Sequence, residues 1–502
     1  MKNLKISLLS ILLFLIGSTM YAEEPINVVR GEQDTVYTKK HNIICITNPG
    51  NIAAINNQQV RVYKTGAFGM EVTLSEGDNV VEITVFKNNN RTIKKLNIYY
   101  SNTPKPQKTY TLSEAEKKLN KNLFHEMLCY VTSKDGAYLQ YGDGEDRLGG
   151  SKLGFIQEGI VLKVVGEIRD LYKIQLSNNR YAYMEKDYTQ ITDKCTKQVN
   201  TGSWSVFNNG KCDRIVIPLP ERIPYSSWTE LDPTTICVDL YGATNNSNWI
   251  VQKQNLAMID YVDYRQPESD VFRVIIKLKE KYSWGHSIKY EGNNLIIDVK
   301  HTPNLTLKGM TIGLDAGHGG SASGAVSATG IKEKDLTLKM VNILKGMLEK
   351  KGVNVVLSRD GDQDMTMKER KKKFLENDID LLISIHCNAG GSPFVSMGTS
   401  AYYKHICNRD FASCLLNRML ELGLPNYGLI GNFNFSLNGP IEYPNALMEV
   451  LFMSSLPDEE KLADTAYLHT LMQNTVLGLE DYMYKVQSSQ EQQTKVKNKK
   501  RK

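Results

Sequence analysis

The hydrophobic pattern of the chain changes near Leu307, and this change divides the 502 residues into two kinds of structure. Before it, short segments alternate apolar and polar residues between clusters of Gly, Asn and Asp, as half-buried β-strands do. After it, apolar strand-like runs alternate with segments whose apolar residues have helical spacing. The chain is also too long for a single hydrophobic core. The pattern therefore predicts a multidomain protein in which β-rich modules precede one α/β domain.

The region before Leu307 divides into three β-rich modules. Residues 25–100 have the alternation of a small antiparallel sandwich, and their stretch GAFGMEVTLSEGDNVVEITV resembles bacterial immunoglobulin-like modules. A polar linker and a short helix are expected over 101–129. Residues 130–194 resemble a bacterial SH3-like barrel, whose central hairpins would come from GIVLKVVGEIRDLYKIQL. Residues 196–303 alternate strands with polar loops and form the third module.

Residues 1–22 have the three-part layout of a secretory signal peptide. Two lysines precede the apolar run 6–16, and small and polar residues follow it up to Ala22. The run is too short to cross a bilayer, which takes about 20 residues. No later segment is long and apolar enough to cross one either. We therefore expect an exported protein without a transmembrane segment.

Charge and cysteine content narrow the classes of function. The net charge of +6 is modest for 502 residues, so it does not indicate a nucleic-acid partner. Much of this charge lies in the tail, 486–502, which we expect to be basic and disordered. The eight cysteines are scattered without a C-x-x-C pair, which argues against a cysteine zinc site. Buried free thiols are the default, and a structural disulfide stays open because export permits one.

The α/β domain, 307–485, is expected to have a mostly parallel sheet flanked by helices. TIGLDAG, VNVVLSR and IDLLISIH have the pattern of strands, whereas KDLTLKMVNILKGMLEKKG and MTMKERKKKFLEN have the pattern of helices. Strands that alternate with helices in this way form parallel sheets covered on both faces. Ligands of such sheets gather at the carboxyl ends of the strands. Polar residues at those ends are therefore candidates for a functional site.

Four polar residues meet that condition. His318, His386 and Glu449 come at or just after the end of a strand, and Glu333 opens the first helix. Two histidines and one carboxylate can hold a catalytic zinc ion and leave one position open. Taken singly, each residue also has a purely structural interpretation. His318 could be a turn residue and His386 a core histidine with a hydrogen-bond partner. Glu449 could belong to a buried ion pair, and Glu333 could be a solvated carboxylate in the first turn of a helix.

The sequence around these residues resembles the zinc-dependent N-acetylmuramoyl-L-alanine amidases over 309–484. The family's motifs D-x-G-H-G-G, E-K-D, S-I-H-x-N-A and E-x-x-F-x-S match, in order, Asp315 to Gly320, Glu333 to Asp335, Ser384 to Ala389 and Glu449 to Ser454. The stretch SRDGDQDMTMKER, 358–370, is similar to a further family motif and the arginine-bearing helix that follows it. The third module is similar in position and strand pattern to targeting modules found ahead of periplasmic amidases.

The resemblance implies a site and a reaction. His318, Glu333 and His386 would bind one zinc ion per catalytic domain, and Glu449 would be the catalytic acid/base. The substrate would be peptidoglycan, cleaved between the lactyl group of N-acetylmuramic acid and L-alanine during wall remodelling or daughter-cell separation. The protein would work in the periplasm or at the cell wall. Wall binding by the N-terminal β modules and a protein activator are open as further partnerships.

Two alternatives and two local expectations accompany this interpretation. The chain could be a catalytically silent wall-binding or scaffold protein, or a zinc amidase of a different acyl–amino bond. Residues 427–444 replace a basic stretch of the family, so we expect the substrate groove to differ there. The interval 387–448 is expected to hold one strand and one helix, about Arg409 to Leu422, without an inhibitory helix across the zinc.

Overall fold

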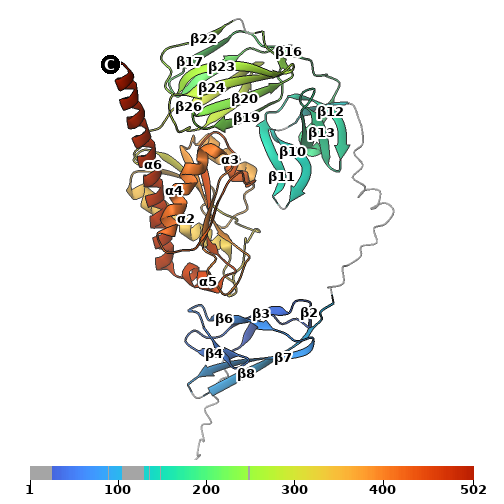
Figure 1. The fold of residues 1–502 in the computed structure, drawn as a ribbon, viewed down its shortest axis with the longest axis vertical. Coiled ribbons are helices and arrows are strands. Elements are labelled where there is room, and N and C mark those ends of the chain that lie inside the picture. Colours follow the sequence, from blue (N-terminus) through green and yellow to red (C-terminus); the bar gives the residue numbers. More distant parts are fainter. Residues whose placement is uncertain are drawn as a thin grey trace, which may run out of the picture. The chain divides into compact units, whose positions relative to one another are not determined.

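The computed structural model describes residues 25–88, 90–103, 129–134, 136–146, 148–246 and 249–501 (Figure 1). The chain divides into two compact units, with the boundary at Lys105. The expected signal peptide and the expected helix at 112–128 lie outside the described residues. Within the described part of the chain, no helix combines the length and the apolar character needed to cross a bilayer.

Module 1, residues 25–103, has two sheets around one core. Their strand orders are β1-β3-β6 and β2-β8-β7-β4-β5. The strands are β1 (Asn27–Arg30), β2 (Thr35–Val36), β3 (Lys40–Ile46), β4 (Ile52–Ile55), β5 (Gln58–Val60), β6 (Ala67–Thr73), β7 (Gly77–Lys87) and β8 (Asn90–Tyr100). Ile43 and Phe68 of the first sheet belong to the same buried cluster as Ile83 and Leu96 of the second. The β-rich character predicted here is confirmed, and the likeness to immunoglobulin-like modules stays a prediction.

Module 2, residues 129–192, is a seven-stranded sheet with the order β11-β10-β14-β13-β12-β9-β15. All of its strand pairs are antiparallel. The strands are β9 (Cys129–Ser133), β10 (Ala137–Asp146), β11 (Gly149–Ile156), β12 (Val161–Ile168), β13 (Leu171–Gln175), β14 (Tyr181–Glu185) and β15 (Thr189–Thr192). Strand β12 alternates buried and half-buried residues along its whole length, as one face of a sheet over a core requires. The SH3-like assignment stays a prediction.

Module 3, residues 199–300, has a five-stranded sheet, β22-β17-β18-β26-β25, a four-stranded sheet, β19-β20-β24-β23, and the short pair β16-β21. The strands are β16 (Val199–Asn200), β17 (Trp204–Asn208), β18 (Cys212–Ile217), β19 (Tyr225–Glu230), β20 (Thr235–Tyr241), β21 (Ala243–Thr244), β22 (Ile250–Gln252), β23 (Ile259–Glu268), β24 (Val271–Leu278), β25 (His286–Glu291) and β26 (Asn294–Lys300). Trp204 of the first large sheet meets Phe272 of the second edge to face, with ring centroids 5.8 Å apart. The two large sheets therefore share one interior.

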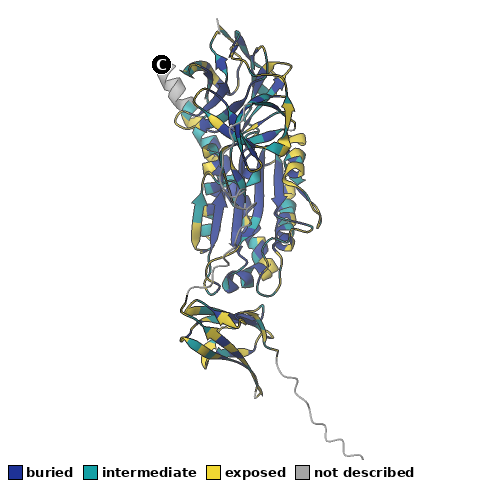
Figure 2. Cartoon of the chain, turned by 90° about the vertical axis from the view of Figure 1, so that its right-hand side faces the viewer, coloured by how far each residue is buried: buried dark blue, intermediate teal, exposed yellow. Residues whose placement is uncertain are grey.

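The C-terminal domain, residues 311–501, is built on a six-stranded sheet with the order β28-β27-β29-β32-β30-β31. Its strands are β27 (Thr311–Ala316), β28 (Asn354–Leu357), β29 (Leu381–Asn388), β30 (Thr399–Tyr402), β31 (Asn426–Ile430) and β32 (Asn445–Phe452). The β30–β32 pair is antiparallel, and the other pairs are parallel. Figure 2 shows these strands buried along most of their length, which explains their nearly continuous apolar sequences.

Helices cover both faces of this sheet. They are α2 (Glu333–Lys350), α3 (Met367–Glu376), α4 (Arg409–Leu420), α5 (Leu456–Ala463) and α6 (Thr465–Arg501). Helices α2 and α4 contact the strands, and α6 packs on both of these helices. Leu382 of β29 belongs to the cluster under Phe374 of α3, whereas its neighbour Ile383 belongs to the main core. Because successive strand residues point to opposite faces, α3 covers the face opposite the main core.

The carboxyl-terminal residues correct one expectation. Helix α6 continues through Arg501, so the prediction of a disordered tail from residue 486 is wrong. Val486 is fully buried, the Gln487 side chain donates to the Leu305 carbonyl at 3.0 Å, and Gln490 donates to Glu280 at 2.8 Å. These contacts hold residues 486–490, the start of the expected tail, against Glu280 and Leu305.

Modules 2 and 3 and the C-terminal domain share one connected core of buried residues that runs from Val131 to Val486. Trp284 of module 3 and Tyr482 of α6 pack with their ring centroids 6.0 Å apart. The Tyr282 hydroxyl donates to Asp410 of α4 at 3.1 Å. The boundaries that the sequence indicates between modules 2 and 3 and the C-terminal domain therefore do not separate independent hydrophobic cores.

All eight cysteines lie among the described residues, and each is a free thiol. Cys195 is exposed, so the expectation of buried thiols fails for that residue. Burial raises the pKa of the Cys45 thiol to about 12, and that of Cys237 to about 12 as well. These two side chains therefore behave as small apolar residues at neutral pH.

Candidate metal centre

His318 lies two residues beyond the end of β27, in a strained turn. Its φ of 61° is in the left-handed region, which non-glycine residues rarely adopt. Arg370 of α3 holds this turn: its guanidinium donates to the His318 carbonyl at 2.5 Å and to the Ala316 carbonyl at 2.7 Å. The same guanidinium pairs with Asp315 at 2.6 Å, and both side chains are 2% exposed. The imidazole is therefore presented by a rigid backbone.

Glu333 is the first residue of α2, as the sequence predicted, but its side chain points into the protein. The side chain is 4% exposed. Backbone amides fix both of its oxygens: Ala325 N–H donates to Oε2 at 2.8 Å, and Cys387 N–H donates to Oε1 at 3.0 Å. A solvated first-turn carboxylate, the structural alternative for this residue, is excluded by this burial.

His386 lies on β29, the strand next to β27 in the sheet. Its Nδ1 is 3.1 Å from Glu333 Oε1. The ring also packs against the backbone of Gly317, where an added Cβ would come within 2.4 Å of His386 Cε1. Residue 317 therefore has to be glycine for the imidazole to occupy this place.

The three side chains converge on one point. Their ligand atoms all lie within 4.8 Å of one another, and His318 Nε2 is 3.1 Å from Glu333 Oε2. Although burial alone would raise the pKa of Glu333, hydrogen bonds from both histidines bring it well below its usual range. Burial would lower the pKa of His386, yet the hydrogen bond to Glu333 and the charge of Glu449 raise it to about 9. A divalent cation bound by these side chains would replace the proton that His386 otherwise holds beside Glu333.

Two imidazole nitrogens and one carboxylate oxygen at this spacing fit a zinc ion, which favours nitrogen and carboxylate ligands in tetrahedral sites. The surroundings fit as well. Gly324 leaves room at the site, since an added Cβ would lie 2.5 Å from Glu333 Oε2 and 2.7 Å from His318 Cδ2. These three protein ligands would leave a fourth position for water or substrate.

Glu449 lies on β32 directly beside His386 in the strand register. The residue is 7% exposed and is separate from the three converging side chains. Its charge contributes to the raised pKa of His386 and, after burial, to the raised pKa of Tyr402. Glu449 therefore places a carboxylate close to the candidate metal site without belonging to its ligand set.

Two buried arginines, for which the sequence pattern indicated no role, support the site. Arg370 is described above, and Arg359, which is fully buried, donates to the carbonyls of Ala316, Gly317 and Lys334 at 3.0, 3.0 and 2.7 Å. Arg359 thereby ties the turn before His318 to the first turn of α2, which carries Glu333. The only sequence signal for either arginine is its place in the motif 358–370.

An aromatic cluster lies beside His386, and we call it the aromatic wall: Tyr402, Phe433 and Phe435. The rings of Phe435 and His386 are nearly parallel, at an angle of 11° and a centroid distance of 6.5 Å. Phe433 and Tyr402 pack on Phe435 at 4.6 and 5.3 Å. The two phenylalanines come from the stretch 427–444, where the sequence indicated an altered groove.

Residues 387–448 contain two strands, β30 and β31, and the helix α4, so one strand more than expected. Helix α4 packs against α6 and strands β30, β31 and β32. It therefore lies on a face of the sheet, and the interval also holds two short 3-10 helices, Ile406–Asn408 and Ser436–Asn438.

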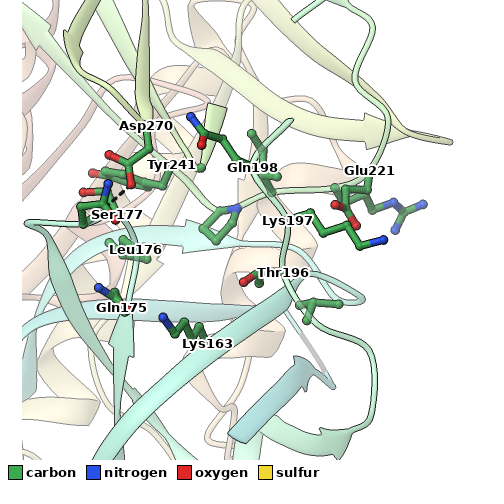
Figure 3. A pocket seen from close by; sticks show the side chains of 16 residues that line it. Lys163, Gln175, Leu176, Ser177, Thr196, Lys197, Gln198, Glu221, Tyr241 and Asp270 are labelled. Atoms are coloured by element: carbon green, nitrogen blue, oxygen red, sulfur yellow. Dashed lines mark hydrogen bonds between the residues drawn. The ribbon is translucent and has the colours of Figure 1, made fainter. Parts of the chain in front are cut away.

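A cavity lies elsewhere, between modules 2 and 3. It has a volume of about 190 Å³, and all of its lining residues lie between 161 and 270. Figure 3 shows Lys163 and Gln175 of module 2 on one side of it and Tyr241 and Asp270 of module 3 on the other. This cavity therefore contains none of the candidate metal ligands.

Comparisons with known proteins match the C-terminal domain. A family model described as N-acetylmuramoyl-L-alanine amidase matches residues 312–481. An uncharacterized Bacillus subtilis protein, YqiI, is 31% identical over 180 residues, which are 35% of this chain and 86% of that protein. The probable cell wall amidase LytH of Staphylococcus saprophyticus is 33% identical over 192 residues. That match spans 38% of this chain and 64% of LytH, which is less than two thirds.

A solved structure is also similar. The N-acetylmuramoyl-L-alanine amidase from Clostridium difficile 630 is 27% identical, with a TM-score of 0.33, and the match covers 35% of this chain and 96% of that structure.

Proposed function

This chain belongs to the N-acetylmuramoyl-L-alanine amidase family, and from that premise we propose that its C-terminal domain is a zinc hydrolase of peptidoglycan. The bond cleaved is the amide between the lactyl group of N-acetylmuramic acid and L-alanine. The observation that carries the proposal is the convergence of His318, Glu333 and His386 within 4.8 Å, with Glu449 adjacent to His386 in the sheet. Exported, wall-associated action follows from the location of this substrate.

His318, Glu333 and His386 would hold the zinc ion. When bound, zinc supplies Lewis acidity toward an amide carbonyl and toward water. The chain's contribution is orientation: backbone amides fix Glu333, Arg370 fixes the turn of His318, and Gly317 fixes the place of the His386 ring. Such supporting contacts commonly change metal affinity or activity 10- to 100-fold when they are lost, as a rough guide.

Glu449 would serve as the general base and then as the general acid. A carboxylate beside the site can accept a proton from the attacking water and return it to the leaving amide nitrogen. Its low exposure, 7%, limits exchange of that proton with bulk water. No serine or cysteine nucleophile is required for this reaction, and the buried Cys387 thiol has a pKa raised well above its usual value by burial.

The proposal is tested with purified peptidoglycan and the zinc-loaded full-length protein. The wild type should release peptides that begin with L-alanine, identified by mass spectrometry, and chelation should abolish release. Glu449→Gln should lower the rate by roughly 10²- to 10⁴-fold while zinc content stays the same. Glu376→Gln is the matched control, because its side chain is 62% exposed on α3.

Unchanged release by Glu449→Gln would sink the assigned mechanism. A zinc-loaded wild type that releases nothing would instead favour the scaffold alternative or the need for a protein activator. Peptides that begin with another residue would indicate an amidase of a different acyl–amino bond.

A further inference from the structure

The segment 433–435 lies between the candidate metal centre and module 2. On one side Phe435 stacks on His386 and packs against Tyr402. On the other side, Asn434 contacts β11 of module 2, although about 280 residues separate them in sequence. A three-residue stretch thus joins a metal-ligand side chain to an N-terminal module.

The contacts of Asn434 use every polar atom of its side chain. Its Nδ2 donates to the carbonyls of Gly149 at 3.3 Å and Gly150 at 2.8 Å. Lys152 Nζ donates to Asn434 Oδ1 at 3.3 Å and to its backbone carbonyl at 3.4 Å. The orientation of the Asn434 side chain is therefore set entirely by β11.

The residues around this contact extend it into a continuous seam. Lys404, two residues beyond Tyr402 of the aromatic wall, donates to the Lys152 carbonyl at 3.1 Å. Lys371 of α3 lies 4.8 Å from the centroid of the Tyr138 ring of β10. Gly439 packs against the Tyr138 hydroxyl so closely that an added Cβ would lie 3.1 Å from it. Module 2 is thus fitted to the C-terminal domain at several points beside the aromatic wall.

Module 3 holds the next part of the same loop. His286 N–H donates to the Ile441 carbonyl at 2.9 Å. At Gly285 an added Cβ would come within 2.3 Å of the Glu442 carbonyl oxygen. The loop from Phe433 to Glu442 is therefore anchored on both N-terminal neighbours, with only a short 3-10 turn, Ser436–Asn438, as secondary structure of its own.

We propose that module 2 is a working part of the substrate groove: its strand β11, through Lys152 and the Gly149 and Gly150 carbonyls, fixes Asn434 and thereby holds Phe435 against His386. The inference rests on the proposed function for its ligand, a muramyl peptide. The aromatic wall would receive the apolar groups beside the scissile amide, and Lys152 and Asn434 are positioning residues. Within the C-terminal domain the Phe433 N–H donates to the Tyr403 carbonyl at 3.2 Å, and module 2 supplies the polar side-chain contacts of Asn434, so both parts hold the segment 433–435.

The test compares Asn434→Ala and Lys152→Met with Lys163→Met. The Lys163→Met control removes the same charge from module 2, but Lys163 lines the cavity of Figure 3 and is not among the contacts of 433–435. All variants are made in the Glu449→Gln background of the full-length, zinc-loaded protein. Hydrogen exchange is followed over residues 431–439, and the affinity for N-acetylmuramoyl-L-alanyl-D-isoglutamine and for zinc is measured.

For Asn434→Ala and Lys152→Met we expect exchange in 431–439 to rise and the affinity for the muramyl dipeptide to fall, each about 10-fold, as loss of a charge-assisted hydrogen bond implies. Zinc affinity should change by less than about twofold, since the three ligands keep their own supports. Lys152→Arg should restore both readouts in large part, because its guanidinium can donate to the same two oxygens.

Unchanged exchange in both variants would overturn the claim that module 2 fixes the segment. Faster exchange with unchanged affinity for the muramyl dipeptide would overturn its role in the groove, as would an equal loss in Lys163→Met. If the parent background does not bind the muramyl dipeptide, the proposed function and the groove role fail together. The exchange measurement still decides in that case whether module 2 holds Phe435 in place.

Discussion

Gly324→Ala is the substitution that most directly tests the geometry of the metal centre. Gly324 has a φ of +68°, and a Cβ at this position would lie 2.5 Å from Glu333 Oε2 and 2.7 Å from His318 Cδ2. Both distances are far below van der Waals contact, so one or both ligand side chains would have to move. The new methyl group would therefore displace the side chains of two candidate metal ligands.

The expected magnitude has two parts. A left-handed backbone costs an alanine about 1–2 kcal/mol relative to glycine, and this cost lowers stability whatever the neighbours are. Displacement of the ligands should lower zinc affinity roughly 10- to 100-fold, or about 1.4–2.7 kcal/mol. Gly330→Ala separates the two parts, because Gly330 has a φ of +87° in the same loop and an added Cβ would meet nothing within 4 Å.

Zinc affinity measured by chelator competition, together with thermal unfolding of the metal-free protein, distinguishes the two variants. Both should lose the stability that a left-handed alanine costs, Gly324→Ala should lose more because of its contacts with Glu333 and His318, and only Gly324→Ala should lose zinc affinity. Wild-type zinc affinity in Gly324→Ala would refute the assignment of His318 and Glu333 to one metal site. Equal loss in Gly330→Ala would show that backbone strain, rather than contact with the ligands, controls binding.

Two further outcomes follow from buried charges. Asp315→Ala leaves the Arg370 guanidinium buried without its carboxylate partner, so the free energy of unfolding should fall by about 3–5 kcal/mol. Urea unfolding with chelator present measures this loss. A loss below about 1 kcal/mol would mean that water reaches Arg370. Burial, followed by the charge of His405, lowers the pKa of His286 to about 3, so the unfolded chain binds a proton more readily than the folded protein does. The stability that His286 contributes is therefore complete above its unfolded pKa of about 6.5. It is lost as the pH falls from there toward about 3, by up to about 1.4 kcal/mol per pH unit. His286→Asn should flatten the dependence of the melting temperature on pH in this range, and an unchanged slope would contradict this origin.

The sequence predicted the residues that converge, His318, Glu333 and His386, better than the residues that support them. His318 and His386 are predictable because parallel strands place their carboxyl ends at one edge, and Glu333 because a helix start follows the same turn. The register that sets Glu449 beside His386 is not readable from either strand alone, since strand pairing is a long-range property. Arg359 and Arg370 were missed because arginine is mostly exposed, and only the complete fold shows the carbonyls that bind their guanidinium groups.

The conformations of the groove and of the tail depend on contacts distant in sequence. Residues 427–444 carry few periodic signals, and Asn434 within them is held by Gly149, Gly150 and Lys152, about 280 positions earlier. The tail beyond residue 486 has the composition of a solvated segment, yet it continues the helix. Its residues Gln487 and Gln490 donate to Leu305 and Glu280, respectively. In both cases the local composition predicts the polarity of the segment but not the distant residues that it contacts.

The connected core from Val131 to Val486 determines how this chain can be divided. A fragment cut at the sequence boundary near 307 would expose the Tyr482 face that Trp284 covers and would release the loop from Phe433 to Glu442. Modules 2 and 3 are thus not interchangeable units: replacing module 3 would need matching changes on α6 and on that loop, and replacing module 2 would need them on the loop. The smallest fragment expected to unfold cooperatively begins at module 2, which makes the hydrolase unit about twice as long as its family match.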